Sequence, residues 1–315
     1  MAIGVGGRAL GLGGAYAAVA NDVSAAYWNP AALSRLVYPE IMLMHDERFG
    51  SLINYDFAAV ALPYGSDATV SVSFMRLGVD GIADSRNAGL DANGNLLPPE
   101  QWQNAVRLDY SRISYFNSAD YAVYFSYAQQ SSSVLSYGVN LKLIRRNIAE
   151  YRATGLGFDL GVLYRVDEHG MLAIVAQDVT TTLVAWSTGR NELVSPTIKV
   201  GGAYSVEVFS GRLTPAMDID VRLENRRFAS VAHVGPISLD PHVGLEFDYK
   251  NSVAVRLGYN DIKQLTLGAG LHLRKLDVDY SYAQFGEEND LGKTHRISLR
   301  FLLEEEKTAR EKPSE

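Results

Sequence analysis

Two pairs of aspartates, each spaced by one residue, come closest in this sequence to a catalytic arrangement. Asp218 and Asp220 form one pair, and Asp277 and Asp279 form the other. In an extended chain alternate side chains point to the same side, so each pair could work as an acid–base couple. Arginines share the same predicted faces, and buried carboxylates usually persist by pairing with such cations. We therefore expect an ionic network rather than a catalytic pair, with these members: Asp218, Asp220, Arg222, Arg256, Arg274, Asp277, Asp279 and Arg296.

Two other groups of residues could bind a metal ion. His242, Glu246 and Asp248 share one predicted face, but nothing in their spacing fixes a coordination geometry, so a structural role is favoured. The stretch from Asp91 begins like a calcium-binding loop, yet its sixth position is Leu96 instead of glycine and its twelfth is Trp102 instead of glutamate. We interpret it as a polar turn and expect no metal site.

The remaining chemistry-bearing residues do not form a recognisable enzyme motif. There is no Gly-x-Ser-x-Gly elbow, and the six histidines have no partners at the spacing of a triad. The absence of cysteine excludes thiolate nucleophiles and thiolate metal sites. A net charge of −7 gives no basic face for nucleic acid. We expect a protein that is not an enzyme, has no cofactor and binds no nucleic acid.

The elements that carry these residues are predicted to be strands, because apolar and polar residues alternate from about residue 40 onward. The clearest row runs from Gln264 to Arg274, where leucines and an alanine occupy every second position. No stretch reaches the roughly 18 apolar residues of a spanning helix. Fourteen strands are expected, at 40–48, 54–63, 68–77, 119–129, 133–146, 153–165, 171–178, 196–207, 213–225, 240–249, 252–259, 264–274, 276–284 and 294–302.

The connections between these strands alternate between short and mostly longer ones, which is typical of an outer-membrane barrel. The pattern holds if 78–118 is one long loop, with the strand-like Ala105 to Tyr115 placed outside the membrane. A soluble β-sandwich would show the same alternation along its strands. Aromatic residues near strand ends on the apolar face favour the membrane barrel, because they match an interfacial girdle: Tyr164, Tyr204, Tyr249, Tyr259 and Phe301.

Residues 1–39 differ from the rest and are expected to form a small plug under or inside the barrel of residues 40–303. The stretch from Ala15 to Trp28 is rich in alanine and predicted to be helical, ending at Asn29-Pro30 because the residue before proline avoids the α region. The glycine run from Gly4 is no dinucleotide fingerprint, since no strand precedes it.

Residues 304–315 are predicted to be a charged periplasmic tail. No secretory signal is visible, so either this is the mature chain with Met1 added, which we expect, or the protein is not exported.

Several motifs resemble the PorV/PorQ family of FadL-like outer-membrane barrels. The N-terminal segment contains Gly-Arg-Ala-Leu-Gly-Leu-Gly-Gly-Ala at 7–15, Asn21-Asp22 and Tyr27-Trp28-Asn29-Pro30-Ala31. The likeness continues through Leu77 to Ile82, Gly157 to Gly161, Arg256 to Tyr259 and Thr294 to Leu299, so it spans nearly the whole chain. It implies an all-β, antiparallel up-and-down barrel of about fourteen strands in the outer membrane of a bacterial cell. The plug or hatch would include Asp22, Trp28, Asn29, Pro30 and Ala31.

The resemblance implies two alternative functions. A PorV-like barrel would serve a type IX secretion system, with secretion subunits and the C-terminal domains of cargo proteins as partners besides outer-membrane lipid. A FadL-like barrel would transport small hydrophobic molecules. The charged interior faces argue against a continuous apolar tunnel, although a route that leaves sideways would avoid them. The long loops around 78–118, 179–195 and 226–239 are the expected partner surfaces.

Overall fold

The computed structural model describes residues 3–48, 52–224, 226, 230–284 and 293–303, and it is a closed antiparallel barrel of 14 strands. All fourteen predicted strands are present. They are β1 (Glu40–Arg48), β2 (Ile53–Tyr64), β3 (Ala68–Asp84), β6 (Ser114–Gln130), β7 (Leu135–Ile148), β8 (Tyr151–Arg165), β9 (Gly170–Gln177), β12 (Thr197–Tyr204), β14 (Gly211–Arg222), β16 (Ile237–Tyr249), β17 (Val253–Tyr259), β18 (Leu265–His272), β19 (Leu276–Gln284) and β20 (Lys293–Leu302). However, β3 ends seven residues later and β6 begins five residues earlier than expected, so 78–118 is not a loop over its whole length; the other ends shift by a few residues.

Each barrel strand pairs with its neighbours in chain order, and β1 closes the ring by pairing with β20. The register at the closure places Leu43 opposite Leu299. Closure leaves no open sheet edge, which is what a barrel in lipid requires. Short strands extend the connections: β10 (Thr182–Trp186), β11 (Asn191–Val194), β13 (Val206–Val208) and β15 (Ala232–Val234).

The apolar faces of the strands point outward. In β18, Leu265, Leu267 and Leu271 are 53%, 48% and 45% exposed, whereas Thr266 between them is buried. The same alternation around the ring produces an apolar belt far larger than a water-soluble monomer exposes. The five aromatic residues expected in the girdle also face outward. This arrangement excludes a soluble sandwich, in which the leucine row would lie between two sheets.

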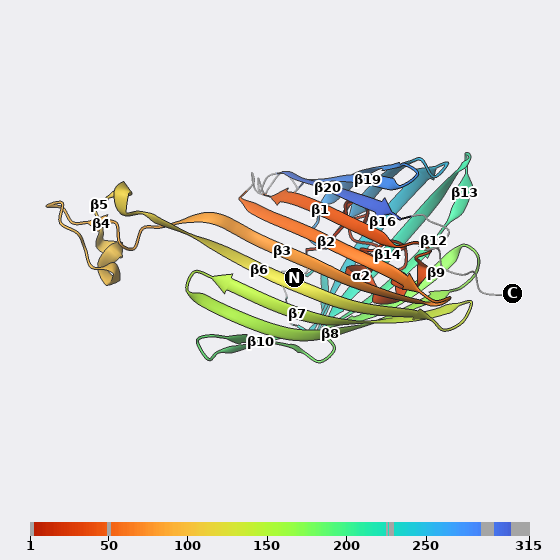
Figure 1. Ribbon diagram of the computed structural model, residues 1–315, viewed down its shortest axis with the longest axis horizontal. Coiled ribbons are helices and arrows are strands. Elements are labelled where there is room, and N and C mark those ends of the chain that lie inside the picture. Colours follow the sequence, from red (N-terminus) through yellow and green to blue (C-terminus); the bar gives the residue numbers. More distant parts are fainter. Residues whose placement is uncertain (1–2, 49–51, 225, 227–229, 285–292, 304–315) are drawn as a thin grey trace.

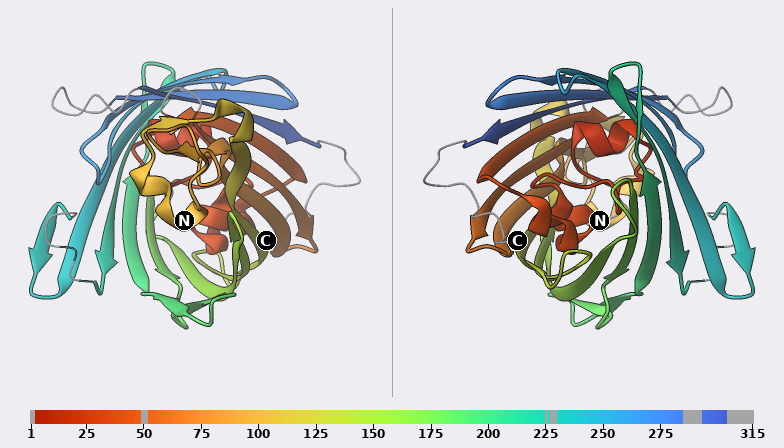
Figure 2. Two further views of the ribbon diagram at one scale, coloured as in Figure 1. Left: turned by 90° about the vertical axis from the view of Figure 1, so that its left-hand side faces the viewer. Right: turned by 90° about the vertical axis from the view of Figure 1, so that its right-hand side faces the viewer.

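The N-terminal segment lies inside the ring, as the views along the barrel axis show (Figure 2). Its helices are α1 (Gly7–Gly11), α2 (Ala25–Trp28) and the 3-10 helix η1 (Pro30–Arg35). The expected helix from Ala15 to Trp28 is therefore wrong over most of its length. Asp22 accepts hydrogen bonds from the backbone and hydroxyl of Ser24, and such local bonds compete with helix formation. Among the described residues no helix is both long and apolar enough to cross a bilayer.

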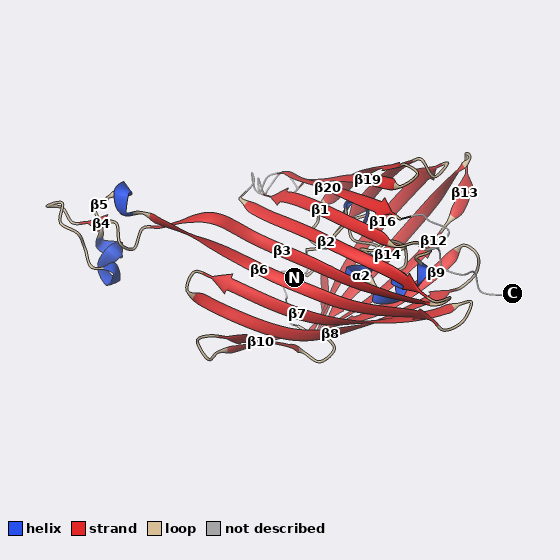
Figure 3. Cartoon of the chain, in the orientation of Figure 1, coloured by secondary structure: helices blue, strands red, loops and turns tan. Residues whose placement is uncertain are grey.

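Strands β3 and β6 continue past the rim of the barrel and carry a small projecting arm, here defined as residues 85–113 (Figures 1 and 3). The arm contains the short pair β4 (Gly89–Leu90) and β5 (Arg107–Leu108) and two 3-10 helices, η2 (Pro99–Asn104) and η3 (Tyr110–Arg112). Most of the segment Ala105 to Tyr115 belongs to this arm, so it adds no strand to the ring. The arm rises from the end of the barrel with the longer loops.

The interior wall of the barrel has two different halves. Strands β1, β2, β3 and β6 present apolar and small hydroxyl side chains to the inside, and their buried charged residues are Glu40 and Asp46 of β1. Strands β12 to β20 carry most of the buried charged side chains of the wall, together with small polar residues and glycines. The expectation of a charged interior therefore holds mainly for the wall formed by β12 to β20, with the buried pair of Lys142 and Asp159 on β7 and β8 in addition. The buried apolar residues of the first half include Met42, Met44, Tyr55, Phe57, Met75 and Tyr124.

Candidate functional site

The plug touches the barrel wall at two places where glycines from adjacent strands stand opposite each other. The first seat is Gly138 of β7 and Gly161 of β8, which are register partners. The second seat is Gly244 of β16 and Gly258 of β17, which are also register partners. At both seats the missing side chains let the plug backbone approach the wall closely.

The first seat receives the Asn-Pro-Ala element. A Cβ atom added to Gly138 would lie 2.4 Å from the backbone nitrogen of Ala31, and one added to Gly161 would lie 2.3 Å from Oδ1 of Asn29. Either atom would overlap the plug. Only glycine therefore fits at these wall positions while the plug keeps its place.

The side chain of Asn29 stabilises the Asn-Pro-Ala element through hydrogen bonds. Its Oδ1 accepts a hydrogen bond from the backbone of Ala31, which caps η1, and Pro30 occupies the first position of that helix. Its Nδ2 donates to the carbonyl of Ala17 at 3.0 Å and to that of Val162 in the wall at 3.3 Å. A fully buried amide thus satisfies backbone groups of both plug and wall.

The neighbouring aromatic residues and Asp22 hold the plug together. Trp28 donates from its indole to the carbonyl of Val5 at 2.9 Å and packs edge-on against Tyr16 and Tyr27. Asp22 accepts a hydrogen bond from the Tyr16 hydroxyl at 2.6 Å. The five residues predicted for the plug therefore all belong to one buried structure inside the barrel, and Asp22 and Trp28 stabilise its fold rather than touch the first seat.

The second seat receives the turn after α1. Gly13 has φ +66°, a left-handed conformation that favours glycine, and a Cβ added to Gly258 would lie 2.2 Å from its backbone nitrogen. A Cβ added to Gly244 would lie 2.7 Å from the carbonyl oxygen of Leu12. His242 adds a hydrogen bond from its ring nitrogen Nδ1 to the carbonyl of Gly13 at 2.8 Å, so it binds the plug.

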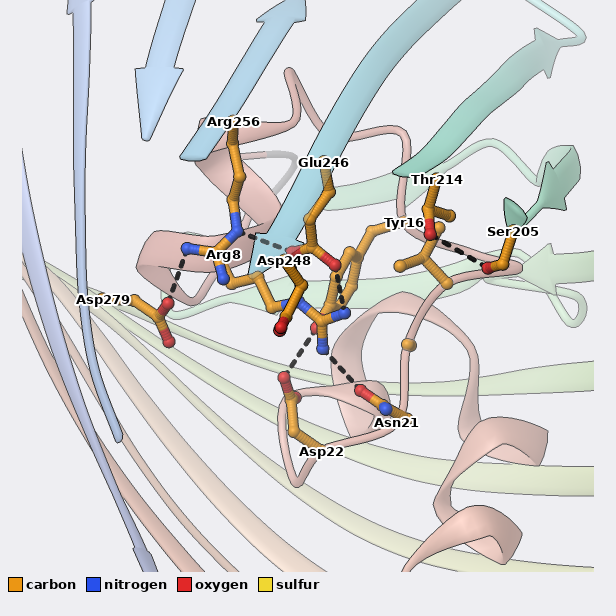
Figure 4. A network of polar contacts seen from close by, with 12 residues as sticks. Arg8, Tyr16, Asn21, Asp22, Ser205, Thr214, Glu246, Asp248, Arg256 and Asp279 are labelled. Carbon is orange, nitrogen blue, oxygen red and sulfur yellow. Dashed lines mark hydrogen bonds and ion pairs between the residues drawn. The ribbon is translucent and has the colours of Figure 1, made fainter. Parts of the chain in front are cut away.

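A chain of ion pairs joins the plug to the wall beside the second seat (Figure 4). Arg8 donates two hydrogen bonds to Glu246, at 2.8 and 2.7 Å. Arg256 donates to the same carboxylate at 2.6 Å and to Asp279 at 2.6 Å. Paired guanidinium–carboxylate contacts of this kind are strong and directional. This is the main electrostatic attachment of the plug.

Asp218 contacts the plug directly by accepting hydrogen bonds from the backbone nitrogens of Tyr16 and Ala17, both at 2.9 Å. Its neighbour Asp220 pairs instead with Lys199 and, at 3.2 Å, with Arg222. The two carboxylates of the predicted pair thus have separate partners. Neither is arranged with the other as an acid–base couple.

The other predicted network residues lie in further groups. Arg222 also pairs with Asp240 at 2.5 Å, Asp277 pairs with Arg300, and Arg296 pairs with Asp46 at 3.2 Å. Arg274 stands apart, because β18 ends at His272 and Arg274 is exposed in the following turn. The structure therefore brings Arg256 and Asp279 together and divides the remaining residues among several smaller groups.

Sequence reasoning missed both glycine seats and several ionic partners, above all Arg8, Glu246 and Lys199. A signal for the seats was present, because Gly138, Gly161, Gly244 and Gly258 all fall on the polar phase of their strands. Glycine is unfavourable inside a strand and often marks a place where another backbone approaches closely.

The metal candidates take other roles. His272 lies 3.4 Å from Asp248 and 3.3 Å from Asp277, and in the part of the chain that the structure describes no group of three or more side chains could hold a metal ion. In the arm, Asp91 accepts hydrogen bonds from the backbone nitrogens of Asn93 and Asn95, both at 2.8 Å. The bonds from Asn95 are the main cause that lowers the pKa of Asp91 below its ordinary value.

Comparison with known proteins gives a structural match without a sequence match. No protein-family model matches the chain, and no curated protein matches it. The toluene transporter TbuX of Ralstonia pickettii superposes with a TM-score of 0.58 at 12% identity, covering 96% of this chain and 99% of that one. The monoaromatic hydrocarbon channel CymD gives 0.61 at 13% identity, covering 96% and 98%.

A FadL homologue of Pseudomonas aeruginosa gives a TM-score of 0.56 at 10% identity, covering 92% of this chain and 96% of that one. At such low identity the likeness concerns the fold. The structural neighbours of this chain are therefore FadL-like outer-membrane barrels, which are channels and transporters.

Proposed function

We propose that this protein is a bacterial outer-membrane channel for small hydrophobic molecules, gated by its N-terminal plug. The observation that carries the proposal is the plug itself: a separate segment of the chain that lies inside a barrel with a partly apolar wall and contacts this wall at two glycine seats. The similar fold of hydrocarbon channels supports it.

The apolar half of the interior gives the proposed substrate class its physical basis. Tyr27 of the plug stacks on Tyr124 of the wall with ring centroids 6.3 Å apart, next to the buried methionines. Aromatic rings and flexible methionine side chains adapt to apolar ligands of varied shape. A displacement of the plug from this half would expose an apolar surface, whereas the ionic half would remain closed by its ion pairs.

The test is uptake by cells. The full chain is expressed in a Gram-negative host, its location is checked by fractionation, and its folding is checked by a gel shift on boiling. Labelled toluene should enter several times faster than in cells with an empty vector. A correctly folded barrel in the outer membrane that leaves the uptake rate unchanged would overturn the proposal.

A second candidate function is favoured by the arm. It projects beyond the rim and exposes apolar side chains, with Trp102 42% and Val106 67% exposed. Such a surface suits the secretion role that the PorV/PorQ resemblance implies, with secretion subunits or cargo C-terminal domains as partners. Pull-down from native membranes separates the two functions. Recovery of these partners with the full chain but not with a chain lacking residues 86–112 supports secretion, and recovery of lipid alone supports the channel.

A further inference from the structure

A polar cavity of about 380 Å³ lies between the plug and the wall at the end of the barrel with the short turns. Its lining combines plug residues, among them Arg8 and Arg35, with residues at or near those turns, among them His169, Arg212 and Arg274. The proposed channel function assigns no role to this cavity. Its position allows a ligand to contact the plug and the wall at once.

Every carboxylate that lines the cavity already has a partner. Glu246 is shared by Arg8 and Arg256. Asp248 accepts a hydrogen bond from the backbone of Asn251 at 2.7 Å and lies 3.4 Å from His272. Asp277 pairs with Arg300. Each carboxylate of the lining therefore already has a partner within the protein, and the five arginines of the lining outnumber its three carboxylates.

Among the described residues, two arginines of the lining, Arg35 and Arg274, have no carboxylate partner, and a third, Arg212, has only an exposed one. Arg35 donates only from Nη1, to the carbonyls of Val19 and Ala20 at 3.2 and 2.9 Å, so among the described residues its Nε and Nη2 groups have no acceptor. Arg274 has no ion pair within the described part of the chain, and Arg212 pairs only with the exposed Glu207 at 3.3 Å. The cavity thus has an excess of positive charge.

The electrostatic environment of Arg35 agrees with an excess of positive charge in the cavity. Burial lowers the pKa of Arg35, which belongs to the plug and not to a spanning strand, and the positive charges of Arg8, Arg165 and Arg212 lower it further. The guanidinium nevertheless stays charged at neutral pH. Like charges gathered around a cavity are unfavourable unless an anion or solvent compensates them.

We propose that this cavity binds a small oxyanion, of the phosphate or carboxylate class, between Arg35 of the plug and Arg212 and Arg274 of the wall. The free Nε and Nη2 groups of Arg35 have the fork geometry that binds two oxygens of one oxyanion. A bound anion would connect the plug to the wall, and a ligand that binds only the assembled state stabilises that state. The site therefore adds a small-anion control to the attachment of the plug.

The experiment is a titration of the full-length protein in detergent with inorganic phosphate at millimolar concentrations and constant ionic strength, followed by the midpoint of thermal unfolding. Acetate is titrated in parallel as the carboxylate probe. We expect a saturable rise of the midpoint with phosphate, with acetate or with both. Arg35→Gln should weaken the apparent affinity about tenfold or more, because a charge-assisted hydrogen bond is lost.

Arg212→Gln serves as the second variant, because Arg212 lies at the rim and, in the part of the chain that the structure describes, has its ion pair with Glu207 and not with the plug. This variant should weaken binding even if Arg35→Gln fails to fold. Arg190→Gln is the matched control, since Arg190 is exposed in the turn between β10 and β11, away from the cavity. A midpoint that does not respond saturably to either anion, or a response of equal size in all three variants, would overturn the proposal.

Discussion

The two seats of the plug hold it by different physical means. At the first seat the bonds between plug and wall come from uncharged groups, such as the amide of Asn29 on Val162 and that of Asn140 on the carbonyl of Ala26 at 2.7 Å. Near the second seat charged groups join such uncharged bonds, namely Arg8 on Glu246 and the carboxylate of Asp218 on the backbone of Tyr16. An uncharged contact can be broken and resolvated at small cost, whereas separating buried charges costs several kcal/mol. The first seat is therefore the better candidate for opening.

The largest effect on stability is expected from Glu246→Gln, which removes the ion pairs beside the second seat. The change leaves Arg8 and Arg256 without their shared carboxylate and should lower the free energy of unfolding by about 3–5 kcal/mol. Equilibrium denaturation of the protein in detergent measures this. Glu207→Gln removes an exposed partner of Arg212 and should have almost no effect. Equal losses in both variants would mean that the ion-pair chain does not anchor the plug.

Gly138→Ala should displace the plug from the first seat by steric overlap. The new methyl group meets the plug backbone at Ala31, so we expect a loss of about 3 kcal/mol, together with a larger single-channel conductance as the plug is displaced. Gly202→Ala is the matched control, because its Cβ would come no closer than 3.5 Å to any atom. Unchanged conductance in Gly138→Ala would show that the first seat does not control the pore.

Asn29→Ala tests the difference between the two seats more directly, because it removes uncharged hydrogen bonds at the first seat without adding a bulky group. The carbonyls of Ala17 and Val162 lose their donor, and the expected loss of stability is about 1–3 kcal/mol. Thermal unfolding compares it with Asn191→Ala, an exposed position in β11. The loss should be smaller than for Glu246→Gln. A loss as large as in Glu246→Gln would remove the proposed difference between the seats.

The smallest effect is expected in the arm, which contacts neither seat and therefore serves as a reference. Because the folded-state pKa of Asp91 is lowered, its stabilisation of the turn is present above the ordinary carboxyl pKa and is lost as the pH falls through the lowered one. Hydrogen exchange of the amides of Asn93 and Asn95, corrected for intrinsic rates, should increase in that acidic range while plug amides stay protected. Asp91→Asn should abolish the pH dependence at these amides.

The sequence was informative about the strands because burial on one face forces a period of two, and this period survives in every barrel strand. It was less informative about the plug, where Gly13 and Asp22 impose local turns that an alanine-rich composition conceals. The ionic partners could not be predicted, because pairs such as Glu246 with Arg256 depend on strand register. Register is set by the three-dimensional closure of the ring, which no single strand encodes.

The link between η1 and β1 limits how far the plug can travel. Residues 36–39 join the end of η1 at Arg35 to the first residue of β1 at Glu40. Four residues span at most about 14 Å when fully extended. Since β1 is held by both β2 and β20, its start is a fixed pivot. Any gating that leaves the ring intact is thus a short swing about this hinge, and complete ejection of the C-terminal part of the plug would require β1 to unzip.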